Sequence, residues 1–382
     1  MDSSFIYYKP VQGKFNIGRK SEQTKLSNML SQGENVLIYE PPKTGKTSLL
    51  QQTFWNMRVS GNQFATAEVS MLSIRRTDDF LLSLGAALIR AEATTPDEFD
   101  TIVRECLPGT HFVFDPARYS DADEVLSLNW DVDENDIRSI FCLPYRLAAV
   151  RGKPYYVVLD EFQSICFLEG WEKILKIFED VLQTSRDSVC AYVFLGSKIN
   201  AMRHIFKEEG WFHRLVNHLQ IENIDAREIT DHIVRNFLTT GKVIDRDLMM
   251  NVCKRFRCNI WYINHFASIC DHLTRGFITD ATLEEALAML ISIHEPRFMD
   301  TVSDLTGFQA SLLRATLEGC KRFSSAEVID RYQLHSSANV RRLKDALCKK
   351  EILFFDEKDD PIVIDPLFEY WAGKYFFGIK GL

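Results

Sequence analysis

The chain has 382 residues, and its 45 basic and 53 acidic side chains give a formal net charge of −8. Its 46% hydrophobic and 26% charged residues are typical of a globular protein and exclude a disordered, fibrous or low-complexity chain. No apolar run approaches the length of a membrane span, and the start carries no secretion signal. The nine cysteines form no CxxC pair, so we expect a reduced, cytoplasmic protein rather than a disulfide scaffold or a zinc ribbon.

Short apolar runs alternate with amphipathic helical patterns in the first part of the chain. Apolar strands that alternate with helices indicate a parallel sheet covered on both faces. We therefore expect an α/β domain over residues 1–222. The predicted strands are 35–39, 64–69, 155–159 and 189–195, and the predicted helices are 21–30, 46–57, 77–91, 136–150 and 171–183.

The second part of the chain has a different pattern. Residues 226–293 look helical throughout, with no strand-like run, and predict a helical lid domain over 223–298. Three further helices (305–319, 325–332 and 337–349) precede two short apolar runs that are joined by a turn at 357–360. Three helices and a β-hairpin predict a winged helix-turn-helix domain over 299–382.

An acidic stretch interrupts the α/β pattern. Between 97 and 136 the chain has twelve acidic residues and two basic ones, which predicts an acidic insertion at about 95–135. Asp131, Asp133 and Asn135 have the spacing that begins an EF-hand loop, but its sixth and twelfth positions hold Asp136 and Cys142 instead of glycine and glutamate. We therefore favour a solvated surface loop or a partner-binding face over a calcium site.

The strongest local signal is the sequence from Glu40 to Thr47, EPPKTGKT, which lies between a predicted strand and a predicted helix. This is the context of a phosphate-binding loop, where backbone amides and the helix dipole attract an anion. Lys46 can reach the β- and γ-phosphates, and Thr47 can offer its hydroxyl to Mg²⁺. Glu40 replaces the usual first glycine, and either disfavours phosphate there or points away from the loop. The predicted phosphate-binding residues are Pro42, Lys43, Thr44, Gly45, Lys46, Thr47 and Ser48.

Polar residues follow two other predicted strands and precede a third. Asp160 and Glu161 end the strand that begins at Tyr155, where we expect Asp160 to hold Mg²⁺ and Glu161 to activate water. Ser197 follows the next strand and could sense the γ-phosphate, or form a strand-ending turn and helix cap. Arg214 precedes a last apolar strand, and could stabilise charge on a neighbouring subunit's nucleotide or form a surface ion pair.

These motifs together resemble the archaeal-type ATPase family, in the STAND branch of the AAA+ superfamily. The resemblance is carried by Phe15-Asn-Ile-Gly-Arg19, the loop before Thr47, Leu159-Asp-Glu-Phe-Gln163, Phe194-Leu-Gly-Ser197, residues 211–225 and Asp365-Pro-Leu-Phe368 with Trp371. It implies a P-loop NTPase sheet, a helical lid and a winged helix, with ATP or ADP and Mg²⁺ as cofactors. It also implies that Gly18 and Arg19 lie on the adenine side, that Ser197 is a sensor and that Arg214 is an arginine finger. The helical region offers no clear sensor arginine, and Arg257 is a weak candidate.

The third winged-helix helix carries a local surplus of positive charge. Arg341, Arg342 and Lys344 could contact DNA phosphates, as recognition helices do. Residues 301–382 nevertheless contain twelve basic and twelve acidic residues, so packing on the ATPase core or binding a protein is the favoured alternative.

We therefore predict a Mg-dependent ATPase that acts as a nucleotide-driven switch, with catalytic roles for Lys46, Glu161, Ser197 and Arg214. Its expected partners are the nucleotide and a protein partner or a second copy, with no membrane. Two alternatives stay open: a nucleotide-binding scaffold with little turnover, and a DNA-binding loader or initiator-like ATPase.

Overall fold

The computed structural model describes residues 4–116, 125–186 and 188–379. The chain divides into two compact units. The first contains residues 20–40 and 49–221. The second contains the N-terminal residues up to 19, the loop 41–48 and the chain from 222 onward. The domain limits expected from the sequence remain predictions.

A five-stranded parallel sheet forms the centre of the first unit, with the strand order β2-β5-β6-β1-β7. The four predicted strands are present: β1, β5 and β6 are apolar runs that are almost wholly buried, whereas β2, at the edge of the sheet, alternates buried with more exposed residues. The fifth strand follows Arg214, as expected, but it is only three residues long, and all three pair with β1. The strands are β1 (Asn35–Tyr39), β2 (Ala65–Ser70), β5 (Tyr155–Asp160), β6 (Ala191–Gly196) and β7 (Val216–His218).

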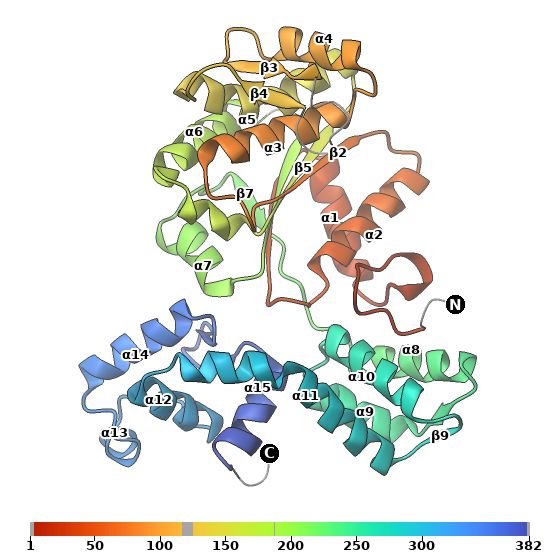
Figure 1. Ribbon diagram of the computed structural model, residues 1–382, viewed down its shortest axis with the longest axis vertical. Coiled ribbons are helices and arrows are strands. Elements are labelled where there is room, and N and C mark those ends of the chain that lie inside the picture. Colours follow the sequence, from red (N-terminus) through yellow and green to blue (C-terminus); the bar gives the residue numbers. More distant parts are fainter. Residues whose placement is uncertain (1–3, 117–124, 187, 380–382) are drawn as a thin grey trace. The chain divides into compact units, whose positions relative to one another are not determined.

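Helices cover both faces of this sheet (Figure 1). On one face, alternate strand residues such as Val36 and Val158 pack against α1 (Lys20–Ser31) and α2 (Lys46–Val59). On the other face, Phe178 of α6 (Trp171–Thr184) contacts Tyr192 of β6, with ring centroids 4.7 Å apart. The helices α3 (Thr77–Arg90) and α5 (Glu134–Arg151) lie on this second face. This is the predicted α/β class, since strands buried on both faces need apolar residues at every position.

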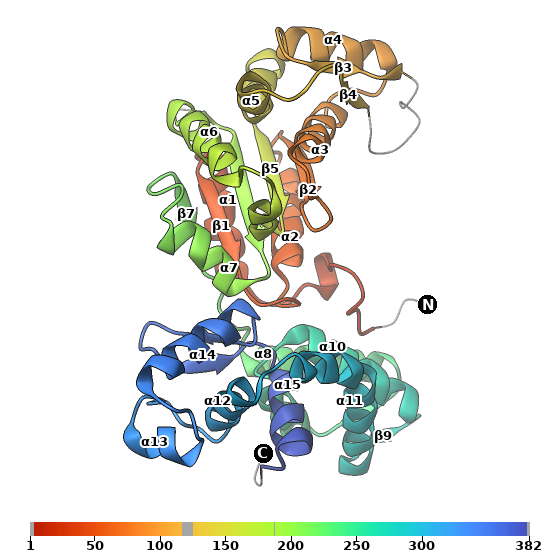
Figure 2. The same cartoon turned by 60° about the vertical axis from the view of Figure 1, so that its left-hand side comes forward.

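The described residues of the acidic stretch are folded, which corrects the expectation of a solvated surface loop and leaves the partner-binding face as a prediction. Its described residues form α4 (Pro96–Cys106) and an antiparallel hairpin of β3 (Phe112–Phe114) and β4 (Leu126–Leu128). Phe99 and Phe112 are buried here because the apolar face of α4 packs on this hairpin and on α3, as Figure 2 shows. Residues 117–124 of the predicted insertion lie outside the described residues.

Helices dominate the second unit. The predicted all-helical region is interrupted by two two-residue strands, β8 (Val243–Ile244) and β9 (Phe277–Ile278), which pair in parallel. They were missed because two residues are too few to produce a periodic signal. The helices of this region are α8 (Ala226–Thr239), α9 (Arg246–Arg255), α10 (Ile260–Leu273) and α11 (Asp280–Ser303).

The C-terminal part has the predicted winged-helix arrangement. Three helices are followed by an antiparallel pair, in which Leu353 lies opposite Val363. Asp365 then caps the short helix α15 (Pro366–Trp371) by accepting hydrogen bonds from the amides of Leu367 and Phe368. The preceding elements are α12 (Gly307–Leu317), α13 (Ala326–Arg331), α14 (Ser337–Lys349), β10 (Leu353–Phe355) and β11 (Pro361–Val363).

Candidate nucleotide site

The loop after β1 contains two residues in the left-handed conformation. Glu40 extends the pairing of β1, since its amide donates to the carbonyl of Gly196 at 3.3 Å. Gly45 has a φ of +90°, a conformation that favours glycine, and Lys43 has a φ of +68°. The loop then enters α2 at Lys46. Left-handed residues in a loop that leads into a helix N-terminus turn backbone amides toward one point, as phosphate-binding loops require.

The side chains of the loop turn back onto one carbonyl group. Lys46 is 7% exposed, and its ammonium donates a 2.9 Å hydrogen bond to the carbonyl oxygen of Pro41. The hydroxyl of Thr44 donates to the same oxygen, also at 2.9 Å. Thr47 is half-buried and Pro42 is exposed. The Pro41 carbonyl therefore holds the loop and its lysine in a compact conformation.

The N-terminal segment packs on this loop within the second unit. Ser48 accepts a 3.1 Å hydrogen bond from the amide of Val11, so its hydroxyl serves the N-terminal segment. A Cβ atom at Gly45 would lie 3.4 Å from Nη1 of Arg19. The amide of Gly18 donates to Glu228 of α8 at 3.1 Å. The structure thus brings together three predicted site elements: Gly18, Arg19 and the loop 41–48.

In the first unit, the acidic pair and the predicted sensor meet at the end of β5. Asp160 is the last residue of β5, and its Oδ1 accepts a 2.9 Å hydrogen bond from the amide of Glu161. Oε2 of Glu161 accepts from the hydroxyl of Ser197 at 2.6 Å and from Nε2 of Gln163 at 2.5 Å. Gln163 was not singled out from the sequence, although its place two residues after Glu161 in a tight 3-10 turn was a usable signal. The Ser197 hydroxyl therefore binds the carboxylate of Glu161, and the N-cap of the following helix is Lys198 rather than Ser197.

Three of these strands end at the same edge of the sheet. Tyr39 of β1 lies opposite Gly196 of β6, and Leu159 of β5 lies opposite Phe194. Because all three strands run parallel, the residues that follow them leave the sheet together. Ligands bind at the carboxyl ends of strands in sheets of this type.

Arg214 lies at the other end of the strands. It precedes β7, whose first residue Val216 lies opposite the first residue of β1, Asn35. The carboxyl edge is thus roughly 15 Å away along β1. Arg214 is exposed, and it makes no ion pair with any described residue.

Lys43 has aromatic and charged neighbours that the sequence did not predict. Its ammonium lies 3.6 Å from the ring centroid of Trp261 on α10. The hydroxyl of Tyr262 donates to Asp365 at 2.8 Å, and Arg297 donates to both of these groups. Burial, followed by the charge of Arg297, lowers the pKa of Lys43 to about 8, while Asp365 opposes the shift.

Arg257, the candidate sensor arginine, contacts residues of the C-terminal part. Its guanidinium donates to the carbonyl of Val363 at 2.6 Å and lies 3.4 Å from the carboxylate of Glu369. Arg257, which follows α9, therefore links this part of the chain to β11 and α15.

The basic helix α14 is only partly free for a ligand. Arg341 and Arg342 are exposed. Lys344, however, bonds both carboxylate oxygens of Asp359 at 2.7 and 2.8 Å and lies 3.9 Å from the ring centroid of Phe355. Lys344 thus belongs to the packing of the hairpin, which leaves two of the three predicted DNA-contacting residues exposed.

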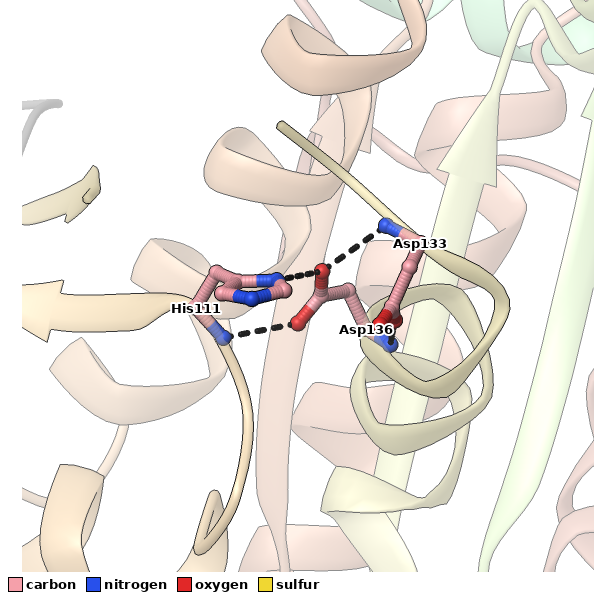
Figure 3. Close-up of side chains that lie close together, drawn as sticks. All are labelled: His111, Asp133 and Asp136. Atoms are coloured by element: carbon pink, nitrogen blue, oxygen red, sulfur yellow. Dashed lines mark hydrogen bonds and ion pairs between the residues drawn. The ribbon is translucent and has the colours of Figure 1, made fainter. Parts of the chain in front are cut away.

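The residues of the calcium hypothesis form a helix cap. Asp133 is the N-cap of α5, and Asp133 and Asp136 accept each other's backbone amides in a capping box. In an EF-hand loop that starts at Asp131, ligand positions 5 and 7 would be Asn135 and Ile137, and both lie inside α5, which rules such a loop out. His111 adds a 2.8 Å hydrogen bond from its Nδ1 and another from its amide to the carboxylate of Asp136, as Figure 3 shows.

His111, Asp133 and Asp136 bring their ligand atoms within 4.8 Å of one another. The capping box and the histidine hydrogen bonds already account for this closeness. Asp136 is fully buried, and burial opposes its charge, but the amides of Asp133 and His111 and the His111 ring outweigh burial and lower its pKa. The hydrogen bond to Asp136 in turn raises the pKa of His111.

Asp136→Ala is expected to lower the free energy of unfolding by about 3 kcal/mol, because it removes a buried ion pair's acceptor and breaks a helix cap.

The same pair makes stability depend on pH. The raised pKa of His111 stabilises the fold below its unfolded pKa, and this stabilisation is lost as pH rises through the folded pKa. The lowered pKa of Asp136 stabilises the fold above its unfolded pKa, and this is lost as pH falls through the folded pKa. Both contributions are present between about pH 4 and 6.5. Urea unfolding from pH 4 to 8 measures this, and an unchanged slope above pH 6.5 in His111→Phe would contradict it.

No helix among the described residues has both the length and the apolar character needed to cross a membrane.

Comparisons with known proteins identify the fold. The family described as "Probable winged helix domain" matches residues 296–374. No curated protein sequence matches the chain. The solved structure of a Walker-type ATPase of Pyrococcus abyssi is similar, with 14% identity and a TM-score of 0.67, over 96% of this chain and 99% of that one.

Two proteins of Aeropyrum pernix are also similar. The Orc2 protein, solved as ADPNP–ADP complexes, has 12% identity and a TM-score of 0.57, over 95% of this chain and 93% of that one. The Orc1 protein, solved in complex with DNA, has 14% identity and a TM-score of 0.50, over 98% of this chain and 97% of that one. The chain therefore has the α/β fold of these archaeal proteins, with a winged helix at its C-terminal end, as the resemblance implied.

Proposed function

We propose that the protein binds Mg-ATP and hydrolyses it as a nucleotide-driven switch. The observation that carries the proposal is the common edge of β1, β6 and β5. A GKT loop follows β1, and an adjacent carboxylate pair ends β5, with β6 between them. The fold shared with a Walker-type ATPase supports it.

In this proposal the loop 41–48 and the first turn of α2 bind the phosphates through backbone amides and the ammonium of Lys46. That ammonium would exchange the Pro41 carbonyl for a phosphate oxygen, which is a charge-assisted and therefore stronger acceptor. Gly18 and Arg19, which lie beside the loop, would border the adenine side.

The residues fit Mg²⁺ by their chemistry, since the hydroxyl of Thr47 and the carboxylate of Asp160 are the hard oxygen ligands it prefers. Burial, followed by the negative charge of Asp160, raises the pKa of Glu68 on the neighbouring strand β2. Glu68 lies two residues before the end of β2, so its repulsion with Asp160 adds negative charge near the end of β5, which favours a cation there. When bound, the ion would neutralise charge on the phosphates.

Glu161 would orient and deprotonate the attacking water. The hydrogen bonds from Ser197 and Gln163 hold one of its oxygens in a fixed direction.

Arg214, at the opposite edge of the sheet, would act on the nucleotide of a neighbouring copy, which makes self-association part of the proposal. Phosphate release from purified protein with Mg-ATP, with EDTA as the control, tests the activity; no release would leave a nucleotide-binding protein only.

A nucleotide-stabilised scaffold is the second candidate. The observation that favours it is the double hydrogen bond on Glu161, which occupies an oxygen that a base needs. If the scaffold is correct, ATP raises the melting temperature but no phosphate is released.

DNA binding is the third candidate, favoured by the winged-helix match and by exposed Arg341 and Arg342 on α14. Replacing both arginines with alanine is expected to weaken duplex binding and to lower the salt dependence by about two released counterions. Fluorescence anisotropy between 50 and about 200 mM salt measures this. Arg322→Ala, outside α14, is the matched control. Absence of duplex binding at low salt would exclude this candidate.

A further inference from the structure

Lys43 adopts a backbone conformation that needs support from its surroundings. Its φ of +68° lies in the left-handed region, where a residue with a Cβ atom is strained. Such strain persists only when neighbouring groups hold the residue in place. The ring of Trp261 is the group that meets the Lys43 side chain, 3.6 Å from its ammonium.

Trp261 is itself firmly placed. It lies in the first turn of α10, where the side chain of Asn259 accepts hydrogen bonds from the amides of Trp261 and Tyr262 at 3.1 and 3.2 Å. The rings of Tyr7 and His265 pack at its edges, with centroids 5.9 and 5.4 Å away. The indole is therefore a rigid surface for the lysine rather than a side chain that follows it.

A hydrogen-bond network continues from this ring toward the winged-helix part. Tyr262 follows Trp261 and donates to Asp365, which also accepts a 2.8 Å bond from Arg297 of α11. Asp365 caps α15. A chain of packed and hydrogen-bonded groups thus runs from the loop 41–48 to the first turn of α15.

We propose that Trp261 and Lys43 form a clamp that positions the phosphate loop for nucleotide, and that Tyr262, Arg297 and Asp365 tie this clamp to α15. Both clamp residues are positioning residues. The inference rests on the proposed nucleotide site. Because the clamp orders the loop before the nucleotide binds, the free energy of binding is not reduced by the entropy cost of ordering it.

The clamp predicts a pH dependence of nucleotide affinity. Four groups besides Tyr262 face Lys43: Arg297 and His294 of α11, His265 of α10 and Asp365. Burial and neighbouring cations lower the pKa of both histidines, that of His294 to about 4, so both are neutral at pH 7. Lys43 is thus the group that titrates near pH 8. Below this pH Lys43 is charged and its cation–π contact with Trp261 is formed. ATP affinity is therefore expected to fall as pH rises through about 8.

The test compares Trp261→Leu, Trp261→Phe, Lys43→Met and Lys43→Arg. Without nucleotide, amide hydrogen exchange of the loop 41–48 is expected to rise in the leucine and methionine variants and to stay low in the other two. ATP affinity, measured by calorimetry, is expected to fall about 2- to 30-fold in the leucine and methionine variants. Lys43→Arg keeps the cation on the ring but does not titrate, so it should retain affinity and lose the pH step.

The double variant separates a clamp from two independent effects. Adding Trp261→Leu to Lys43→Met should cause no further loss, because both remove the same contact. Lys374→Met, which removes an ammonium 5.3 Å from the ring of Tyr370, is the matched control and should leave the loop unchanged.

The outcomes distinguish the clamp from the proposed function. If the unmodified protein binds no ATP, the proposed function fails, while the exchange measurement still decides the clamp. Unchanged loop exchange in Lys43→Met, additive losses, or tighter ATP binding in Trp261→Leu would each overturn the clamp. Lys43→Met settles the matter if the tryptophan variants do not fold, since Lys43 is a half-buried loop residue.

Discussion

Lys46→Ala is expected to weaken ATP binding between tenfold and more than a hundredfold. The substitution removes a charge-assisted hydrogen bond to phosphate, worth about 1.5–3 kcal/mol. Titration calorimetry with ATP and Mg²⁺ measures the effect.

Loop geometry and charge have to be separated in this experiment, because Lys46 also donates to the Pro41 carbonyl. Thr44→Val removes the other donor to that oxygen without removing a charge. Its loss of affinity is expected to be at most about fivefold, the size of a neutral hydrogen bond. Equal ATP affinity in Lys46→Ala and the unmodified protein would rule out the assigned phosphate site.

Glu161→Gln is expected to bind ATP with similar affinity and to hydrolyse it about 10²–10⁴ times more slowly. Glutamine has the same shape and can still accept the Ser197 hydroxyl, but it cannot take a proton from water. Phosphate release under single-turnover conditions measures the chemical step directly.

Glu169→Gln is the matched control for this variant, since Glu169 is an exposed glutamate eight residues further along the chain. Its turnover is expected to equal that of the unmodified protein. If Glu161→Gln also turns over at that rate, Glu161 has no part in the reaction and the scaffold becomes the better description.

Much of the fold could be predicted from local patterns. The strands at 35–39 and 155–160 are buried on both faces, so each is an apolar run that needs no partner to be recognised. The loop before Thr47 could be predicted because an anion-binding turn imposes a glycine and a lysine at fixed positions. The acidic stretch was misjudged because its many charged residues dominate the local sequence, although Phe99 of α4 and Phe112 of β3 are buried.

The candidate site was predictable only in part. Asp160 and Glu161 follow a strand, and a parallel sheet sends such residues to a known edge. That Ser197 binds Glu161 depends on the register of β5 against β6, which places the two strand ends side by side. Register is a property of the pairing and leaves no mark on either strand alone.

The amino-acid sequence by itself determined the class of fold, the order of its parts and the phosphate-loop motif, because burial periodicity and turn chemistry act over a few neighbouring residues. Only the tertiary structure decided that Lys43 meets Trp261, that Arg257 fastens α15 and that Arg214 stands at the opposite edge of the sheet. These contacts join residues far apart in the chain, and they depend on how completed helices and strands pack against one another.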